Sequence, residues 1–361
     1  MVSLNKENVK SYTTDGKVRH KSNDEDINEK IGKILGNKWS EYRKKWDAVN
    51  NFEIQTDFPM FLHLDLHQVC NYSCPHCNIS HLEELKKQFD GKISEKMDFE
   101  KYKRIIDEGS EHGCPSVEPQ GTNEPLLIKN FEKYLKYAHE KNFIDIMINT
   151  NASALTEKRS KQLLDSGITR LRFSLDAATP ETYKKVRVGS LPLEKVHKNI
   201  FKFLELKEKG GYKLPVTGVS MCVMRGNEHE KEMFENFWID KVDMVSLQAF
   251  TPPNYAPENK ILFQSFFPES FKGNKDKNLS SDEKIQDFKC VQPFQRVVIR
   301  NDNITACCNT YSNQLSIGKL QDGIYNAWNS AFAKQIREMH LCGKYYENAT
   351  CKRCVETTDF E

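Results

Sequence analysis

The sequence predicts an α/β protein: a partial (β/α)6 barrel of the TIM-like type, followed by a small C-terminal α+β domain. Strand-like and helix-like segments alternate six times between residues 61 and 250, which is typical of a parallel sheet that curves or closes. A polar stretch at residues 272–284 then separates this part from shorter segments with closely spaced cysteines. The composition, 38% hydrophobic and 29% charged residues, is that of an ordinary globular chain.

Each element is predicted from its own run of residues. Apolar residues at helical spacing over residues 27–52 predict one or two docking helices after a polar N-terminal tail. Strands are expected at residues 61–66, 116–121, 144–150, 171–176, 215–224 and 242–250. Helices are expected at residues 97–113, 130–142, 157–167, 181–186, 193–210 and 230–241, with short strands near 294–308 and a helix over 323–341. The expected parts are residues 1–60, 61–271 and 272–361.

Charge and hydropathy narrow the classes of function. A formal net charge of +2 gives no electrostatic reason to expect a nucleic-acid or membrane-surface partner. No run approaches the roughly 18 apolar residues of a membrane span, and the N-terminus lacks the apolar core of a secretory signal. We therefore expect a cytoplasmic protein, in which the eleven cysteines stay reduced and clustered ones serve as metal or redox ligands.

A first cysteine group, Cys70, Cys74 and Cys77, follows the first predicted strand. The spacing C-x-x-x-C-x-x-C brings three thiolates into one tight loop, which suits three corners of a four-iron four-sulfur (4Fe-4S) cluster. The fourth iron would have no protein ligand and could bind an exogenous molecule, as the open position of a catalytic zinc does. The alternative is a zinc site whose fourth ligand is a nearby histidine, His67, His76 or His81.

Four ordered segments, CNYSCPHC, GTNEPLL, INTNAS and FSLDAATPETYKKVR, carry a resemblance to a known family. Over roughly residues 61–250 the chain resembles the radical S-adenosylmethionine (SAM) superfamily. The resemblance implies that Cys70, Cys74 and Cys77 ligate a cluster whose open iron binds SAM. In that family the reduced cluster cleaves SAM to methionine and a 5′-deoxyadenosyl radical, which takes a hydrogen atom from a substrate C–H bond.

The resemblance also implies SAM contacts at individual residues. Glu124 stands where the family's Gly-Gly-Glu motif has its Glu, near the methionine amino group, although Thr122 and Asn123 replace the usual glycines. Ser174 matches a position near the SAM ribose, and Asp176 lies on the same face of its strand. Three more contacts are implied. Arg187 would pair with the SAM carboxylate, Asn151 would line the pocket, and His76 would stack on the adenine.

A second cysteine group lies toward the C-terminus and comprises Cys290, Cys307, Cys308, Cys351 and Cys354. It resembles the SPASM and twitch extensions of radical SAM enzymes, in which four such cysteines hold an auxiliary cluster. Cys308 is preferred to Cys307 because it stands five residues past the predicted turn residue Asn303, the spacing usual in that pattern. A single auxiliary 4Fe-4S cluster, the twitch form, is implied. The alternative is a structural zinc bound by four cysteines.

A second cluster with four thiolates has no open iron, so electron transfer is its natural role. The predicted reaction is therefore radical oxidation of a hydroxyl-rich small molecule (a sugar, aminocyclitol or nucleotide sugar), similar to that of twitch-type aminocyclitol dehydrogenases. Cys222 is a candidate hydrogen-atom donor to a substrate radical. Polar substrate contacts are expected from strand faces and ends near the opening: Glu118, Gln120, Arg172, Gln248 and Tyr255.

Three alternative functions remain open. One is epimerisation of a sugar by the same radical chemistry. Another is maturation of a ribosomal peptide, although residues 1–60 are unlike the winged-helix domain that commonly binds leader peptides. The third is a non-catalytic iron-sulfur or zinc protein, against which the SAM-like motifs argue. The expected partners are a small-molecule substrate and a reductant such as flavodoxin or ferredoxin.

Overall fold

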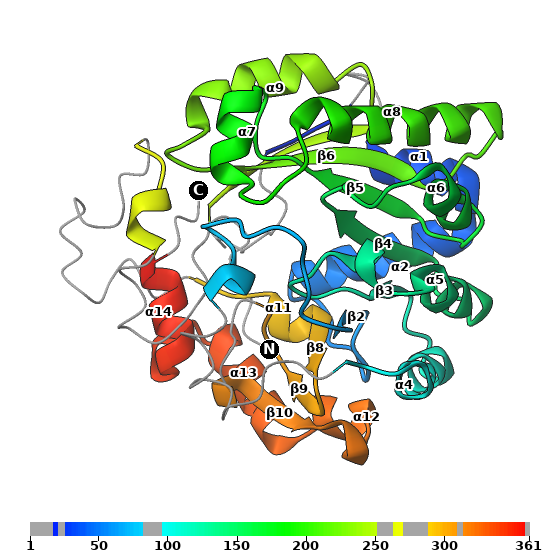
Figure 1. Ribbon diagram of the computed structural model, residues 1–361. Coiled ribbons are helices and arrows are strands. Elements are labelled where there is room, and N and C mark those ends of the chain that lie inside the picture. Colours follow the sequence, from blue (N-terminus) through cyan, green and yellow to red (C-terminus); the bar gives the residue numbers. More distant parts are fainter. Residues whose placement is uncertain are drawn as a thin grey trace.

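A ten-stranded sheet runs through the computed structural model, which describes residues 17–20, 26–81, 96–250, 263–269, 288–308 and 313–357 (Figure 1). Its strands, in spatial order, are β1 (Lys17–His20), β7 (Met244–Ala249), β6 (Val216–Val223), β5 (Arg170–Ser174), β4 (Asp145–Thr150), β3 (Ser116–Glu118), β2 (Phe61–Asp65), β8 (Arg296–Arg300), β9 (Asn303–Thr305) and β10 (Ser316–Lys319). Strands β2 to β7 are parallel and follow chain order. The predicted α/β fold with a partial barrel is confirmed.

Helices connect the parallel strands and lie along the outside of the sheet (Figure 1). They are α4 (Phe99–Glu111), α5 (Phe131–Glu140), α6 (Glu157–Leu164), α7 (Pro180–Val186), α8 (Leu193–Lys209) and α9 (Lys231–Trp238). Polar caps start several of them: the carboxylate of Asp98 accepts from the amide of Lys101, and the Thr156 hydroxyl from the amide of Arg159. Short 3-10 turns are η1 (Asn78–His81), η3 (Pro125–Leu127), η4 (Glu228–Glu230), η6 (Gln264–Phe266), η7 (Asn313–Leu315), η8 (Leu320–Asp322) and η9 (Tyr345–Glu347).

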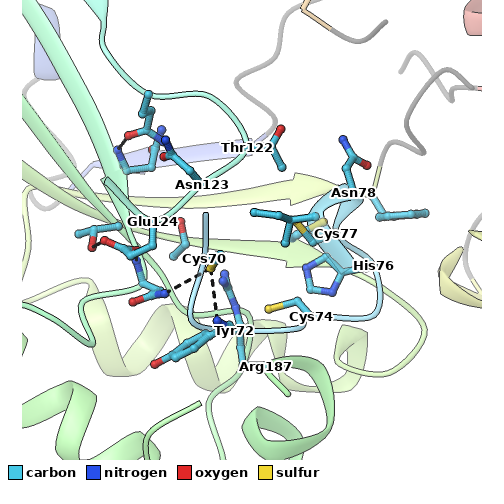
Figure 2. A pocket seen from close by; sticks show the side chains of 18 of the residues that line it. Cys70, Tyr72, Cys74, His76, Cys77, Asn78, Thr122, Asn123, Glu124 and Arg187 are labelled. Atoms are coloured by element: carbon cyan, nitrogen blue, oxygen red, sulfur yellow. Dashed lines mark hydrogen bonds between the residues drawn. The ribbon is translucent and has the colours of Figure 1, made fainter. Parts of the chain in front are cut away.

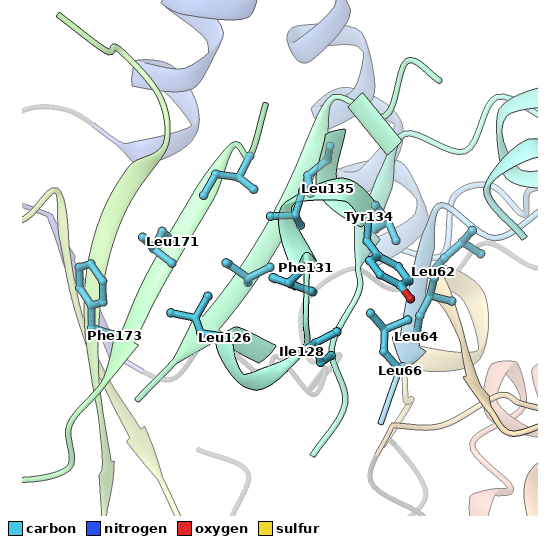
Figure 3. Close-up of a cluster of buried hydrophobic side chains, with 14 of the residues drawn as sticks. Leu62, Leu64, Leu66, Leu126, Ile128, Phe131, Tyr134, Leu135, Leu171 and Phe173 are labelled. Atoms are coloured by element: carbon cyan, nitrogen blue, oxygen red, sulfur yellow. The ribbon is translucent and has the colours of Figure 1, made fainter. Parts of the chain in front are cut away.

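The main core lies between the strands and these helices. Leu62, Leu64 and Leu66 alternate along β2 and the residue after it, and all three are buried (Figure 3). Leu171 and Phe173 do the same on β5. Because neighbouring side chains of a strand point to opposite faces, the residues between these apolar ones face the inside of the barrel. The strands therefore present polar side chains to the interior, as the sequence predicted.

The predicted N-terminal helical segment forms α1 (Ile27–Leu35) and α2 (Asn37–Asn50). Ile31 and Trp39 pack with Met60, Val216 and Phe294 in a second buried cluster. Met60 precedes β2 and Val216 begins β6. The two helices therefore cover the N-terminal ends of the strands, opposite the end where the cysteine loop leaves β2.

Three expectations about secondary structure need correction. Residues 1–26 were expected to be a polar tail, but β1 within them pairs antiparallel with β7. The strand expected at 116–121 ends at Glu118, because Pro119 has no amide hydrogen for the ladder. The helix expected at 323–341 is two helices, α12 (Ile324–Trp328) and α13 (Ala331–Leu341), since the hydroxyl of Ser330 caps the second at the amide of Ala333.

The C-terminal segment joins the same sheet. Strand β8 pairs parallel with β2 along its whole length, and β9 and β10 extend the sheet as antiparallel strands. Helices α11 (Gln292–Gln295) and α14 (Ala349–Thr357) complete this part, shown in orange and red in Figure 1. The strand β8 thus lies directly beside the strand that carries the first cysteine loop. Among the described residues, none of the helices combines the length and apolar character that crossing a bilayer requires.

Candidate functional site

The first cysteine group lines a cavity of about 330 Å³ at the C-terminal ends of the parallel strands (Figure 2). Cys70, Cys74 and Cys77 all face it. The loop is closed by a hydrogen bond from the amide of Cys77 to the carbonyl of Cys74, 2.9 Å long. The amide of Tyr72 points at the sulfur of Cys70 over 3.4 Å. This loop brings the three predicted ligands to one place.

The thiols of this group are poorly solvated. Burial raises the pKa of Cys70 and Cys74 above the ordinary thiol value, and it raises the pKa of Cys77 to about 12. Backbone amides directed at Cys70 and Cys77 act in the opposite direction. Thiolates here would need a positive partner to compensate for lost hydration, and a metal cluster is such a partner. The donor set therefore fits the predicted cluster.

Arg187 supplies positive charge at the same place, and its guanidinium lies between Cys70 and Cys74 in Figure 2. Its Nη2 lies 2.7 Å from the Asp176 carboxylate, which also contacts Nε2 of His76 at 3.3 Å. Burial opposes ionisation of Asp176, but Arg187 and His76 outweigh it and hold the pKa of this carboxyl below its usual range. The Nε of Arg187 is buried without a hydrogen-bond partner. The side chain lines the cavity and so supplies positive charge for an anionic ligand.

Asp176 itself does not line the cavity, although the sequence predicted it as a SAM contact. Its backbone has φ of 62°, a left-handed conformation that is costly for a residue with a Cβ. Its Oδ1 accepts from the amide of Cys222 over 2.8 Å. From behind the cavity wall, the aspartate therefore positions the side chains of Arg187 and His76 and the backbone of Cys222, near the end of β6.

Glu124 faces the cavity from the opposite side of the cysteine loop (Figure 2). Its carboxylate accepts from the Thr150 hydroxyl and the amide of Asn151, each over 2.6 Å, and from the amide of Leu126 over 3.1 Å. Burial raises the pKa of this carboxyl despite these three donors. A carboxylate has about four acceptor positions, so one remains for a donor in the cavity. The predicted amine contact is compatible with this arrangement.

Gly121, three residues before Glu124, is required by its contact with β2. A Cβ on Gly121 would lie 2.3 Å from the carboxylate of Asp65, so only glycine fits there. Asp65 is fully buried and pairs with Arg300 over 2.9 Å. Asn123, which stands at a usual glycine position, donates to the carbonyl of His67 over 2.8 Å. The departure from the motif is thus accommodated by contacts of this chain.

A second, narrow apolar cavity is lined by Cys290, Cys307, Cys308, Cys351 and Cys354. Burial raises the pKa of Cys290, Cys308 and Cys351. Cys307 and Cys308 both line this cavity together with the other three cysteines. Both members of the adjacent pair therefore lie near the other thiols, and the choice between them stays a prediction. Among the described residues, no three His, Cys, Asp or Glu side chains meet closely enough to hold a single metal ion.

A third cavity, of about 720 Å³, occupies the inside of the barrel. It shares four lining residues with the first cavity: Asn149, Ser174, Cys222 and Cys308. Cys308 also lines the cavity of the C-terminal cysteines. The two cysteine groups and the barrel interior therefore meet at this one side chain.

The predicted substrate contacts divide between the cavities. Gln120 lines the first cavity, and Glu118, Arg172 and Gln248 line the barrel cavity. Tyr255 lies outside the described residues. Among the SAM contacts predicted, Ser174, Asn151 and His76 line the first cavity along with Glu124 and Arg187.

Several cavity residues were missed in the sequence. Tyr72, within the cysteine loop, lines the first cavity and its hydroxyl lies 3.4 Å from that of Tyr183. Asn149 lines both large cavities and donates its side-chain amide to Glu118 over 2.7 Å. The signal for Asn149 was present, because it alternates with the buried Ile148 and Thr150 on β4. No comparable signal marked Tyr72.

The chain is similar in sequence to proteins named "Probable GTP 3′,8-cyclase". The protein from Methanosarcina mazei is 32% identical over 200 residues, which are 55% of this chain and 56% of that protein. The protein from Methanococcus maripaludis strain C5 is 31% identical over 137 residues, 38% of this chain and 43% of that protein. The chain thus spans about half the length of the curated relatives it matches.

Among solved structures, the chain resembles Streptococcus suis SuiB bound to S-adenosylmethionine, with a TM-score of 0.58, 13% identity and coverage of 83% of this chain and 72% of that one. At this identity the likeness concerns the fold alone. The sequence profile described as "Radical SAM superfamily" matches residues 65–237. That span contains the first cysteine loop, Glu124 and Arg187. Residues 65–237, just under half of the chain, therefore match the radical SAM superfamily.

Proposed function

We propose that the protein is a radical SAM enzyme that oxidises a hydroxyl-rich small molecule and passes an electron to an auxiliary cluster. Cys70, Cys74 and Cys77 would hold the first cluster, and Cys290, Cys308, Cys351 and Cys354 the second. Glu124, Asn151, Ser174, Arg187 and His76 would contact SAM. When bound, these groups supply a 5′-deoxyadenosyl radical that takes a hydrogen atom from the substrate, and an acceptor for one electron.

One observation carries the proposal. Cys308 lines the cavity of the first cysteine group, the cavity of the other C-terminal cysteines and the barrel cavity. The cysteine that we expect to bind the second cluster therefore borders the space in which a substrate would lie. Oxidation needs an electron acceptor close to the substrate, whereas a purely structural metal site does not. This position favours a redox role for the C-terminal cysteines.

The barrel cavity also offers an acceptor for the hydroxyl proton of the substrate. Nδ1 of His63 lies 3.1 Å from the Glu118 carboxylate, which also accepts from Asn149. A neutral imidazole that donates from Nδ1 keeps Nε2 as an acceptor. His63 lines the barrel cavity. We infer that Nε2 of His63 takes the proton, while Asn149 and Glu118 fix the ring orientation.

A second candidate function rests on Cys222. This residue lines both the first cavity and the barrel cavity, and its amide is held by Asp176. Burial raises the pKa of its thiol, which keeps the hydrogen on sulfur. A protonated thiol beside the substrate can donate a hydrogen atom to a substrate radical. That outcome would be epimerisation instead of oxidation.

The test uses anaerobically reconstituted protein with SAM, dithionite and candidate substrates, namely sugar phosphates, nucleotide sugars and aminocyclitols. GTP is included because the similar proteins are named GTP 3′,8-cyclases. 5′-Deoxyadenosine and an oxidised product are measured together. Cys70→Ala should abolish both. Cys351→Ala should keep deoxyadenosine but stop oxidised product, and the exposed Cys342→Ala should change neither.

Other outcomes would contradict the proposal. Native protein that forms no deoxyadenosine under any condition would refute radical chemistry. Equal loss of cleavage in Cys70→Ala and Cys351→Ala would give the second group a structural role. A product with solvent-derived hydrogen on carbon, lost in Cys222→Ala, would replace oxidation by epimerisation. Turnover of GTP alone would move the function toward that of the relatives.

A further inference from the structure

The barrel cavity is larger than a single sugar ring requires. Its volume of about 720 Å³ lies within the roughly 300–1,000 Å³ of sites that hold drug-sized ligands. At one end it meets the first cavity at Ser174 and Cys222. At the other end it reaches Asp145 and Arg170, at the starts of β4 and β5. A substrate that reacts beside Ser174 thus has space for a second part deeper in the barrel.

The acidic groups that line this cavity are already engaged. Glu118 contacts His63 at 3.1 Å. Asp145 pairs with Arg170 at 2.9 Å and accepts from the Tyr42 hydroxyl at 2.9 Å. Asp26, at the cavity edge, caps helix α1 by accepting from the amide of residue 28. None of these carboxylates forms an ion pair with the two remaining guanidinium groups of the barrel strands.

Those two groups belong to Arg172 on β5 and Arg296 on β8, and both line the cavity. Among the described residues, Arg172 donates to the sulfur of Met147 alone, over 3.7 Å, and its Nε is buried without a partner. Arg296 donates to the Gln295 side chain over 3.2 Å and lies 4.7 Å from the ring centroid of Phe61; its Nε is likewise buried without a partner. Within the described part of the chain, neither guanidinium forms an ion pair with a carboxylate.

Both side chains are partly buried, line this cavity and have no carboxylate partner among the described residues, so the cavity is expected to take up an anion. A guanidinium presents a planar fork of donors that matches a phosphoryl group in bidentate geometry. We propose that Arg172 and Arg296 bind a phosphoryl group of the substrate, which makes the substrate a sugar phosphate or nucleotide sugar and excludes a cationic aminocyclitol. This inference rests on the proposed function, because it concerns the other end of the same substrate.

Binding is tested apart from turnover. Reconstituted protein with SAM, but without a reductant, is titrated calorimetrically with glucose 1-phosphate, UDP-glucose, glucose and glucosamine. We expect at least one phosphorylated probe to bind roughly 10- to 100-fold more tightly than glucose, the range of one or two charge-assisted hydrogen bonds. Equal affinity for all four probes, or tightest binding of glucosamine, would overturn the inference.

Variants locate the site. Arg172→Gln should remove most of the preference for phosphorylated probes over glucose, whereas the exposed Arg104→Gln should leave that preference as it is. If Arg172→Gln lowers the melting temperature, Arg172→Lys replaces it, and we expect a weaker but remaining preference because the charge stays and the fork is lost. An unchanged preference in either variant would overturn the role of Arg172.

The two proposals can fail separately. Phosphate-selective binding without any deoxyadenosine under reducing conditions would refute the proposed function and leave the anion site standing. Deoxyadenosine and oxidised product from an uncharged or cationic substrate, without phosphate selectivity, would refute the anion site alone.

Discussion

Arg300→Gln tests the buried link between the cysteine loop and the C-terminal segment. Asp65 ends β2, Arg300 ends β8, and their side chains are 0% and 10% exposed at a distance of 2.9 Å. Among the described residues, the side chain of Gln68 also donates to this carboxylate, at 2.9 Å, and Asp65 Oδ1 is buried without a partner. Removal of the guanidinium therefore leaves a fully buried carboxylate with one neutral donor. Loss of one member of such a pair costs about 3–5 kcal/mol.

The assay is urea unfolding at pH 7, followed by tryptophan fluorescence, because Trp39, Trp238 and Trp328 are buried. The matched control is Lys101→Gln, which removes the exposed pair between Lys101 and Asp302, also a contact from the core to the C-terminal segment, at 2.7 Å. Its expected cost is below about 1 kcal/mol.

The double variant Asp65→Asn with Arg300→Gln removes both charges of the buried pair, so it should be more stable than Arg300→Gln alone. A cost of Arg300→Gln no larger than that of the Lys101 control would refute the reasoning. A double variant less stable than Arg300→Gln would refute it as well.

Three further predictions concern other residues. Gly121→Ala should reduce stability and SAM binding, because its Cβ would lie 2.3 Å from Asp65. The control Gly226→Ala, whose Cβ would lie 3.7 Å from its nearest neighbour, should be tolerated. Equal melting temperatures of the two variants would contradict this prediction. Glu124→Gln should weaken SAM binding in equilibrium dialysis by roughly 10-fold or more, because the new NH2 group would face the Thr150 hydroxyl or the Asn151 amide, which are both donors. Unchanged affinity would count against a contact between Glu124 and SAM. Burial lowers the pKa of His197, so its neutral form stabilises the fold at high pH, and that stability is lost as pH falls below about 6.5. His197→Phe should reduce this loss when the free energy of unfolding is measured at pH 5–8. The same pH dependence in the native protein and the variant would contradict this prediction.

Much of the fold could be predicted because its signals are local. Alternating apolar residues such as Leu62 and Leu64 mark a strand regardless of its neighbours, and the six strands with their helices then predict a parallel sheet. The spacing of Cys70, Cys74 and Cys77 is likewise local, and the loop carries all three to one cavity. The superfamily-like motifs extended this prediction over roughly residues 61–250, and the superfamily profile matches residues 65–237.

The remainder depends on contacts between distant parts of the chain. Asp65 and Arg300 are 235 residues apart, so neither the pair nor the reason for Gly121 could be read from the sequence. The pairing of β8 with β2, which brings Cys308 to the first cavity, has the same origin. Motif matching also placed Asp176 at SAM, but its side chain turns to Arg187 behind the cavity wall.

The central claim is that the C-terminal cysteines hold a redox cluster beside the substrate space. Iron, sulfide and zinc contents of anaerobically reconstituted protein, combined with Mössbauer spectra, test it most directly. We predict about eight iron atoms per chain in the native protein, and about four both in a Cys70, Cys74, Cys77→Ala variant and in a Cys290, Cys351, Cys354→Ala variant. About four iron atoms in the native protein, unchanged by loss of the C-terminal cysteines or accompanied by one zinc, would contradict the account.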